Sequence, residues 1–405
     1  MWRGPFALVF VARLLTAAGF FGTIPYLVVA LTESYHYRST SATFVVGITV
    51  LVSRLASFPV GLAVDRVGVE GMLIASSLGG GAALAGLALV PAPLYGAIVA
   101  AAIVQGVGSA GQSVAFSAWV ARRLPGQATL GFSSLAIAFS LGGIVGPAST
   151  APFVLHGNYR GLFAVAAALY AAAGAVLLIS AGRRGPTELR QLVSAQSPRV
   201  SVSALLAGSF IALYFVTWAL LQQLSVGLAK YFVDFFGSAP AAPAFFVMQS
   251  AAVILLFSAA GARMSRWNDD RLFLSYAVGT LLIPLAFFSL ALFPRGAVAL
   301  AVVTLTLLIA LSELASVPSA GALVANLVPS TRQGSAFGVI GLVQACALTA
   351  GTCLGGFALD YSERIGWPPA YWIIVTGAFG GLGALALIAG LIALRQIRHH
   401  VLAGA

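Results

Sequence analysis

Apolar runs of about 20 residues recur along this 405-residue chain, and short polar stretches separate them. A helix of that length crosses about 30 Å of hydrocarbon. Because 60% of the residues are hydrophobic and only 8% are charged, a water-soluble domain is excluded. The runs predict an all-α polytopic membrane protein with twelve transmembrane helices, at residues 5–31, 40–63, 71–91, 94–118, 129–154, 161–181, 203–229, 243–263, 272–293, 298–327, 335–358 and 370–394.

The basic residues between these runs predict the orientation. With the amino terminus inside, fourteen of the 21 Lys and Arg residues face the cytoplasm and five lie outside. Positive charge is enriched on the cytoplasmic side of membrane proteins, so we expect an inner-membrane protein with both termini cytoplasmic. The net charge of +11 also attracts anionic membrane lipid, whereas nucleic acid is not an expected partner because the charges are spread over separate loops.

The chain repeats itself. "GLAVDRVGVEG" at 61–71 follows the second run, and "GARMSRWNDDR" at 261–271 follows the eighth, at an offset of 200 residues. We therefore expect two pseudo-symmetric six-helix bundles, residues 1–181 and 203–405, joined by a cytoplasmic linker at 182–202. Duplicated halves of this kind are typical of transporters that rock one half against the other.

Two motifs resemble the major facilitator superfamily, and within it the twelve-helix drug:proton antiporter family. The loop after the second run matches the family's Gly-x-Leu-Ala-Asp-Arg-x-Gly-Arg-Lys pattern at Gly61, Asp65, Arg66 and Gly68, with Ala63 and Val64 in place of Leu-Ala and with Val69 and Glu70 in place of the final basic pair. The fifth run matches the antiporter pattern Gly-x-x-x-Gly-Pro-x-x-Gly-Gly at Gly142, Gly146 and Pro147, with Thr150 and Ala151 in place of the last glycines. The resemblance implies the major facilitator fold and drug export coupled to protons.

One departure concerns proton coupling. The antiporter family carries an Arg in helix 4, three residues before a Gln-Gly pair, and here that pair is Gln105 and Gly106 while the expected Arg position is Ala102. This departure argues against the family's usual proton-relay scheme.

Only Arg13, Arg54 and Glu313 lie well inside the runs. Each costs about 2.5–3.5 kcal/mol at the centre of a membrane helix, so each needs a partner, a water-filled cavity or a function. The resemblance implies a central cavity lined by helices 1, 4, 7 and 10, and polar or aromatic residues recur at helical spacing on those runs. The predicted substrate cavity comprises Arg13, Phe20, Arg54, Gln105, Gln112, Tyr214, Trp218 and Gln222.

Glu313 is the candidate for proton coupling. A carboxylate whose neighbours change as the protein moves can take up and release a proton near neutral pH. The alternative is a fixed ion pair with Arg13 or Arg54 that only holds the halves together. Arg54 has three possible roles: binding an anionic substrate, replacing the missing Arg in coupling, or extending its charge toward the cytoplasm.

Two further groups are predicted to serve conformational change. Gly61, Asp65 and Arg66 form a candidate gate at a helix end, where the alternative is an ordinary charged turn. Gly142, Gly146 and Pro147 form a candidate helix-packing motif that allows close approach and bending, or merely fills space with small residues.

No enzyme chemistry is indicated. The four histidines lie in loops or in the tail without metal-like spacing, and there is no phosphate-binding glycine loop, so we predict no metal and no cofactor. The sequence predicts a monomeric, proton-coupled exporter of small amphipathic molecules. A carrier of one anionic metabolite, such as a carboxylate siderophore, is the alternative, and a receptor or lipid scramblase also stays open.

Overall fold

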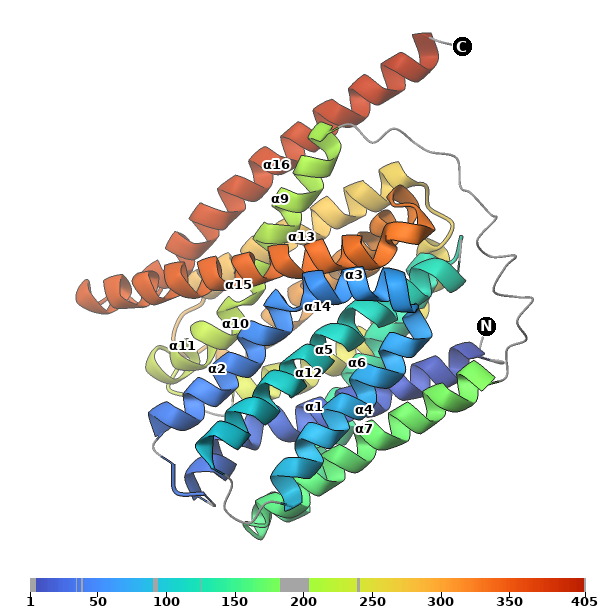
Figure 1. The fold of residues 1–405 in the computed structure, drawn as a ribbon. Helices are drawn as coiled ribbons and strands as arrows, with labels where there is room; N and C mark the ends of the chain where they lie inside the picture. The colour runs from blue at the N-terminus through green and yellow to red at the C-terminus, as the bar shows by residue number, and fades with distance from the viewer. Residues whose placement is uncertain are drawn as a thin grey trace. The chain divides into compact units, whose positions relative to one another are not determined.

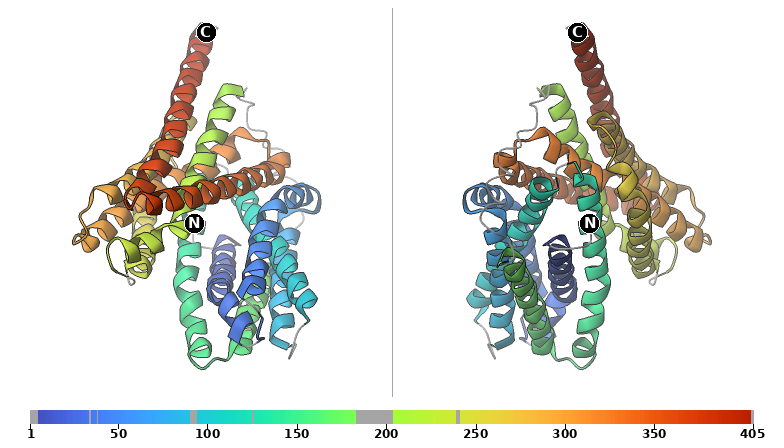
Figure 2. Two further views of the ribbon diagram at one scale, coloured as in Figure 1. Left: turned by 90° about the vertical axis from the view of Figure 1, so that its left-hand side faces the viewer. Right: turned by 90° about the vertical axis from the view of Figure 1, so that its right-hand side faces the viewer.

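A computed structural model describes residues 5–33, 35–37, 39–89, 94–124, 126–182, 204–238 and 241–403, and every regular element in them is a helix. Figure 1 shows the path of the chain, and Figure 2 shows the same helices from two further sides. The helices before residue 183 are α1 (Pro5–Glu33), α2 (Ser39–Leu55), α3 (Ser57–Val67), α4 (Val69–Leu89), α5 (Tyr95–Arg123), α6 (Ala128–Leu155) and α7 (Tyr159–Gly182).

The helices after residue 203 continue the same pattern of long apolar segments. They are α9 (Ala204–Leu221), α10 (Gln223–Val226), α11 (Leu228–Asp234), α12 (Ala241–Met264), α13 (Asp269–Leu292), α14 (Val298–Leu327), the 3-10 turn Ser330–Arg332, α15 (Gln333–Arg364) and α16 (Ala370–Ala403).

The predicted spans are confirmed as helices. Ten helices in the described residues are long and apolar enough to cross a membrane, and the bent pair α2 and α3 makes an eleventh. The eighth predicted run falls on α12, whose apolar stretch is Ala244–Ser258. Each of the twelve runs therefore coincides with one helix or with a bent or broken helix.

The bend in the second span has a local cause. The axes of the two segments differ by 48°. Pro59 lies in the first turn of α3 and has no backbone N–H, so it cannot donate to the carbonyl oxygen of Leu55 one turn earlier. The flanking bonds Ala56 N to Val52 O (2.8 Å) and Val60 N to Ala56 O (2.9 Å) persist. The bond that Pro59 cannot make thus accounts for a bend that does not end the span.

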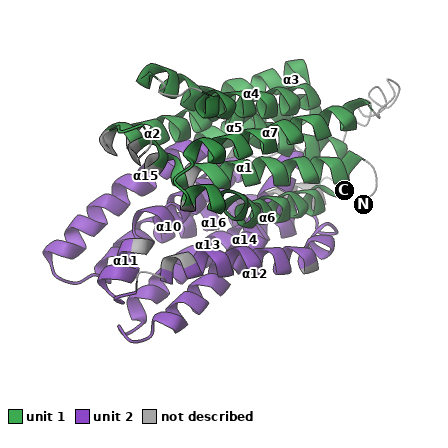
Figure 3. Cartoon of the chain, turned by 90° about the horizontal axis from the view of Figure 1, so that it is seen from below, with its two compact units in different colours: residues 1–197, 328–342 green, residues 198–327, 343–405 purple. Residues whose placement is uncertain are grey.

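The chain divides into two compact units (Figure 3). Unit 1 comprises residues 1–197 and 328–342, and unit 2 comprises 198–327 and 343–405. The start of α15 thus belongs to the first unit and the rest of that helix to the second. The predicted linker at 182–202 lies outside the described residues except for its first residue, Gly182, which ends α7. The division into equal six-helix halves stays a prediction.

Each unit has its own core. In unit 1, α1 packs against α6 and α7, and α4 packs against α5 and α7. In unit 2, α13 and α12 pack against α14, and α9 packs against α16. Two fully buried aromatic residues, Trp372 and Phe287, stack in the unit 2 core with ring centroids 5.0 Å apart. Lipid tails are as apolar as these side chains, so van der Waals packing is what holds such helices together.

Candidate functional site

The side chain of Glu313 is hydrogen-bonded to a residue of a neighbouring helix. It lies near the middle of α14, and its Oε2 accepts a hydrogen bond of 2.7 Å from Nε2 of Gln249 in α12. Within the described residues, the other carboxylate oxygen has no hydrogen-bond partner and no ion pair. The arrangement leaves one oxygen able to carry a proton while the amide holds the other in place.

Gln249 was missed by the sequence analysis. It is the one amide side chain in the eighth apolar run, and a polar residue inside a span is itself a signal. Arg13 and Arg54, the proposed ion-pair partners of Glu313, both belong to unit 1, whereas Glu313 belongs to unit 2.

Arg13 is held between two aromatic rings. Its guanidinium carbon lies 5.2 Å from the ring centroid of Phe116 in α5 and 4.6 Å from that of Phe139 in α6. Such contacts are worth about 0.5–2 kcal/mol, more when water is excluded. They replace part of the hydration that the cation loses inside the bundle, and they explain how unit 1 accommodates an intramembrane charge. Phe139 was not among the predicted residues.

Two buried donors in this part of unit 1 lack an acceptor. Nε of Arg13 and Nε2 of Gln112 are inaccessible to solvent and make no hydrogen bond with any described residue. Gln112 lies one turn before Phe116 on α5, so both face the same side of that helix. Buried donors without a partner are rare in folded proteins, and they indicate a missing acceptor.

Gln105 serves a different set of contacts. Its Nε2 donates to the hydroxyl oxygen of Tyr170 in α7 at 3.0 Å, and both residues are buried. The ring of Tyr170 lies against Gly19 and Gly80, where an added Cβ would meet ring atoms at 2.7 Å and 3.2 Å. Gly19 and Gly80 thus leave room for the Tyr170 ring between α1 and α4. The Tyr170 hydroxyl in turn holds the amide of Gln105.

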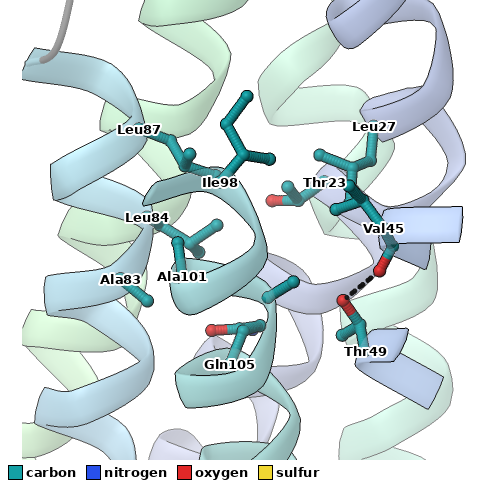
Figure 4. A pocket seen from close by; sticks show the side chains of 11 residues that line it. Thr23, Leu27, Val45, Thr49, Ala83, Leu84, Leu87, Ile98, Ala101 and Gln105 are labelled. Carbon is teal, nitrogen blue, oxygen red and sulfur yellow. Dashed lines mark hydrogen bonds between the residues drawn. The ribbon is translucent and has the colours of Figure 1, made fainter. Parts of the chain in front are cut away.

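Gln105 also lines a narrow pocket among α1, α2, α4 and α5 (Figure 4). Ala102, which occupies the position where the antiporter family carries its helix 4 Arg, forms part of the wall. The lining residues are Thr23, Leu27, Val45, Thr49, Ala83, Leu84, Leu87, Ile98, Ala101, Ala102 and Gln105.

The remaining predicted cavity residues fall in both units. In unit 1, Phe20 is half-buried, and its ring centroid lies 5.4 Å from that of Phe21. Arg54 is half-buried at the end of α2, two residues before the bend. In unit 2, Tyr214 and Trp218 lie on α9 with ring centroids 6.2 Å apart. A single cavity that contains residues of both units stays a prediction.

Gln222 lies where the seventh predicted span breaks. α9 ends at Leu221 and α10 begins at Gln223, and Nε2 of Gln222 donates to Oγ1 of Thr352 at 3.1 Å. The adjacent Gln223, which was not predicted, is fully buried: its Nε2 donates to the carbonyl oxygens of Ala219 and Gly351, and its Oε1 accepts from the hydroxyl of Tyr371. These bonds satisfy polar groups at a helix break inside the membrane region, as that medium requires.

Asp65 binds the beginning of α15. Its carboxylate accepts hydrogen bonds from the backbone N–H of Gly334 (2.9 Å) and of Ser335 (2.8 Å), and from the Ser335 hydroxyl. It also forms an ion pair with Arg122 at the end of α5. The first N–H groups of a helix have no partner within the helix, so an anion there is stabilised by hydrogen bonds and by the helix dipole.

The other gate residues behave differently. Gly61 packs directly on the backbone of α15, because an added Cβ would collide with the carbonyl of Gly334 and would lie 3.1 Å from Cα of Gly338. Arg66 is exposed and forms no ion pair with a described residue. A second ion pair, Arg123 to Glu70 at 2.7 Å, was not predicted and joins the end of α5 to the start of α4.

Gly142 and Gly146 both face α1. A Cβ added at Gly142 would lie 2.8 Å from the backbone nitrogen of Ala18 in α1. A Cβ added at Gly146 would collide with the carbonyl oxygen of Ala18. Pro147 follows inside α6, which continues unbroken to Leu155. Close approach of two helices through small residues is a common packing mode in membranes.

These observations define a polytopic α-helical membrane protein with intramembrane charges held inside its helix bundles. The chain belongs to the Major Facilitator Superfamily: the family model matches residues 9–316, about three quarters of the chain. No curated protein matches the sequence significantly.

Several solved transporters are similar to the chain over nearly its whole length. The chain is 17% identical to the human organic anion transporter MFSD10 (TETRAN), with a TM-score of 0.71 and coverage of 96% of this chain and 98% of that one. A bacterial homologue of the iron transporter ferroportin in its outward-facing state is 17% identical, with a TM-score of 0.74 and coverage of 97% and 100%. The transporter FucP in its outward conformation is 16% identical, with a TM-score of 0.68 and coverage of 95% and 98%.

At these identities the similarity shows the fold, and substrates do not transfer with it. The family assigns the chain to the transporters rather than to the enzymes.

Proposed function

We propose that this protein is a proton-coupled antiporter of the inner membrane, with both termini cytoplasmic, that exports small amphipathic molecules as a monomer by alternating access. The observation that carries the proposal is the Glu313 carboxylate, set near the middle of a 30-residue helix and bound by the amide of Gln249. An ionisable group at that depth needs a function or a partner to offset its cost.

The chemistry of the pair suits proton coupling. The Gln249 amide donates to Oε2, which positions the carboxyl group without neutralising it. A proton can then bind Oε1 from one side of the membrane and leave to the other when the surroundings of Glu313 change. One charge moving inward supplies about 2.3 kcal/mol per 100 mV, enough for an outward gradient of some tens-fold.

Unit 1 offers the surroundings that an amphipathic molecule needs. The rings of Phe116 and Phe139 beside Arg13 supply apolar and aromatic faces, and Gln112 supplies a polar group on the same side of α5 as Phe116. A few convergent polar groups in a mostly apolar wall are typical of small-molecule sites. We assign substrate contact to this group.

A carrier of one anionic metabolite is the second candidate, and a specific observation favours it. Nε of Arg13 and Nε2 of Gln112 are buried donors without an acceptor among the described residues. A carboxylate could accept from both, because charge-assisted hydrogen bonds to a guanidinium are among the stronger polar contacts. In this case Arg13 is a substrate ligand.

Transport by purified protein in proteoliposomes tests both candidates. A pH gradient is imposed, and uptake and efflux are measured for a panel of cationic, neutral and anionic compounds of similar size. Accumulation against a gradient that collapses with a protonophore supports proton-coupled export. Transport of anions alone, with no response to the pH gradient, favours the second candidate and contradicts the first.

A further inference from the structure

The pocket among α1, α2, α4 and α5 has a mostly aliphatic wall. Three polar side chains face it, Thr23, Thr49 and Gln105, and each is more than nine-tenths buried. Figure 4 shows them around the same space. The pocket lies within unit 1, and none of its lining residues belongs to the aromatic contacts of Arg13.

The hydroxyl donors of both threonines and one of the two N–H donors of Gln105 are already used. Thr23 donates its hydroxyl to the carbonyl oxygen of Gly19 at 2.7 Å, and Thr49 donates to that of Val45 at 3.0 Å. Nε2 of Gln105 donates to Tyr170. The hydroxyl oxygens of Thr23 and Thr49 can therefore only accept a further hydrogen bond, whereas the Gln105 amide keeps one N–H donor and its Oε1 acceptor.

One of these acceptors lacks a partner. Oε1 of Gln105 is inaccessible to solvent and accepts no hydrogen bond from any residue that the structure describes. Buried amide oxygens are nearly always paired with protein or with ordered water, so a hydrogen-bond donor beyond the described residues is indicated at this oxygen. The free space beside the amide is enough for about one water molecule, which limits the partner to a small group.

We propose that this pocket binds one small hydrogen-bond donor at Oε1 of Gln105: a water molecule, or the hydroxyl or ammonium head of a small aliphatic molecule. An anion is disfavoured there, because a carboxylate would meet three acceptor oxygens and a single remaining N–H donor, that of Gln105. Where the donor belongs to a transported molecule, the inference deepens the proposed function and rests on it.

Binding of one-carbon probes to the purified full-length protein tests the chemistry without any membrane gradient. Thermal unfolding is followed in methylammonium, methanol and formate, each compared with sodium chloride or buffer at equal ionic strength. Ala102→Leu fills the pocket, and Ala100→Leu adds the same bulk at an exposed position of the same helix. Methylammonium or methanol should raise the melting temperature of the wild type and of Ala100→Leu, with at least about tenfold weaker apparent affinity in Ala102→Leu.

A second measurement detects bound water. X-ray pulses generate hydroxyl radicals from ordered water, and the adjacent side chains are oxidised. Leu84 and Leu87 in the wall should be labelled in the wild type and protected in Ala102→Leu. If Ala102→Leu does not fold, Ala101→Leu fills the same pocket from a half-buried position.

The two measurements distinguish a bound ligand from bound water as the hydrogen-bond donor. Stabilisation by methylammonium or methanol assigns the donor to a ligand, and labelling without stabilisation assigns it to water. Formate that binds as well as methylammonium, or a pocket that is neither labelled nor stabilised, overturns the inference. Because binding is read without a pH gradient, a failure of proton coupling leaves this result standing, and the reverse also holds.

Discussion

The amide of Gln249 donates to the carboxylate of Glu313 across 2.7 Å, joining α12 to α14 inside unit 2. The two residues are 64 positions apart in the sequence. The hydrogen bond holds Oε2 of Glu313 in place, and Oε1 has no hydrogen-bond partner among the described residues.

Glu313→Gln should abolish accumulation driven by a pH gradient while substrate binding persists. The substitution keeps the shape and most hydrogen-bonding capacity but removes the titrating group. Transport and binding are measured in proteoliposomes across pH 5 to 9, and the pH dependence of binding should flatten in the variant. Gln249→Leu should alter the same pH profile, whereas Ser250→Ala, the next residue on α12, should not. Normal proton-driven accumulation by Glu313→Gln would place the coupling group elsewhere, and loss of folded protein would mark Glu313 as structural.

Asp65→Asn should slow turnover while leaving substrate affinity within a few-fold. Asp65 binds the start of α15 and Arg122, and it has no contact with the predicted substrate residues Arg13 and Gln112. Removing its charge weakens a helix-capping interaction worth about 1 kcal/mol and shifts the balance of conformations. Turnover is compared with Arg66→Gln, whose exposed side chain should be dispensable. Unchanged turnover of Asp65→Asn at normal expression would reduce this group to an ordinary charged turn.

Arg13→Gln should weaken the binding of an anionic substrate by about 1–3 kcal/mol, which is the cost of a lost charge-assisted hydrogen bond. Arg54→Gln should act in the same direction if that residue also contacts the anion. A cationic substrate should bind no worse. Arg13→Lys retains the charge and serves as the control, since it loses the planar stacking on Phe116 and Phe139 but not the attraction. Anion binding that survives both Gln substitutions would exclude the second candidate function.

Gly142→Ala should destabilise the protein, by about 1–3 kcal/mol, because its Cβ would be forced into the backbone of α1. The neighbouring Gly143 provides the matched comparison, since a Cβ there would lie 3.6 Å from the Phe21 ring, an ordinary contact. Melting temperatures in detergent should fall for Gly142→Ala and stay nearly unchanged for Gly143→Ala. Equal melting temperatures would mean that close approach of α1 and α6 does not depend on Gly142.

Cysteines introduced at Ser194 and Ser238 should be labelled from opposite sides of the membrane, Ser194 from inside and Ser238 from outside. The reason is the enrichment of basic residues in the predicted cytoplasmic loops. An impermeant thiol reagent is applied to intact cells and to inverted vesicles, after the exposed Cys346 and Cys353 have been replaced by Ser. The reverse labelling pattern would overturn the proposed orientation.

The sequence by itself determined the helices. In a membrane every backbone N–H and C=O must be satisfied within the segment, so each apolar run of about 20 residues has to be helical, whatever surrounds it. The same local information identified Arg13 and Glu313 as intramembrane charges, and the motif at 61–68 as a feature of the superfamily. Pro59 was present as a signal for the bend of the second span, but its depth in the membrane could not be judged from the sequence.

Only the tertiary structure decided the partners. Glu313 contacts Gln249, which is 64 residues away in the chain. Arg13 contacts Phe139, 126 residues away, and Asp65 contacts the start of α15, about 270 residues away. Which side chains meet depends on how each helix is rotated about its own axis and which neighbour it packs against. Those two quantities are set by the close packing of small residues across helix pairs, as at Gly61 and Gly146, and the hydrophobic pattern of a segment that is apolar on all sides carries no record of them.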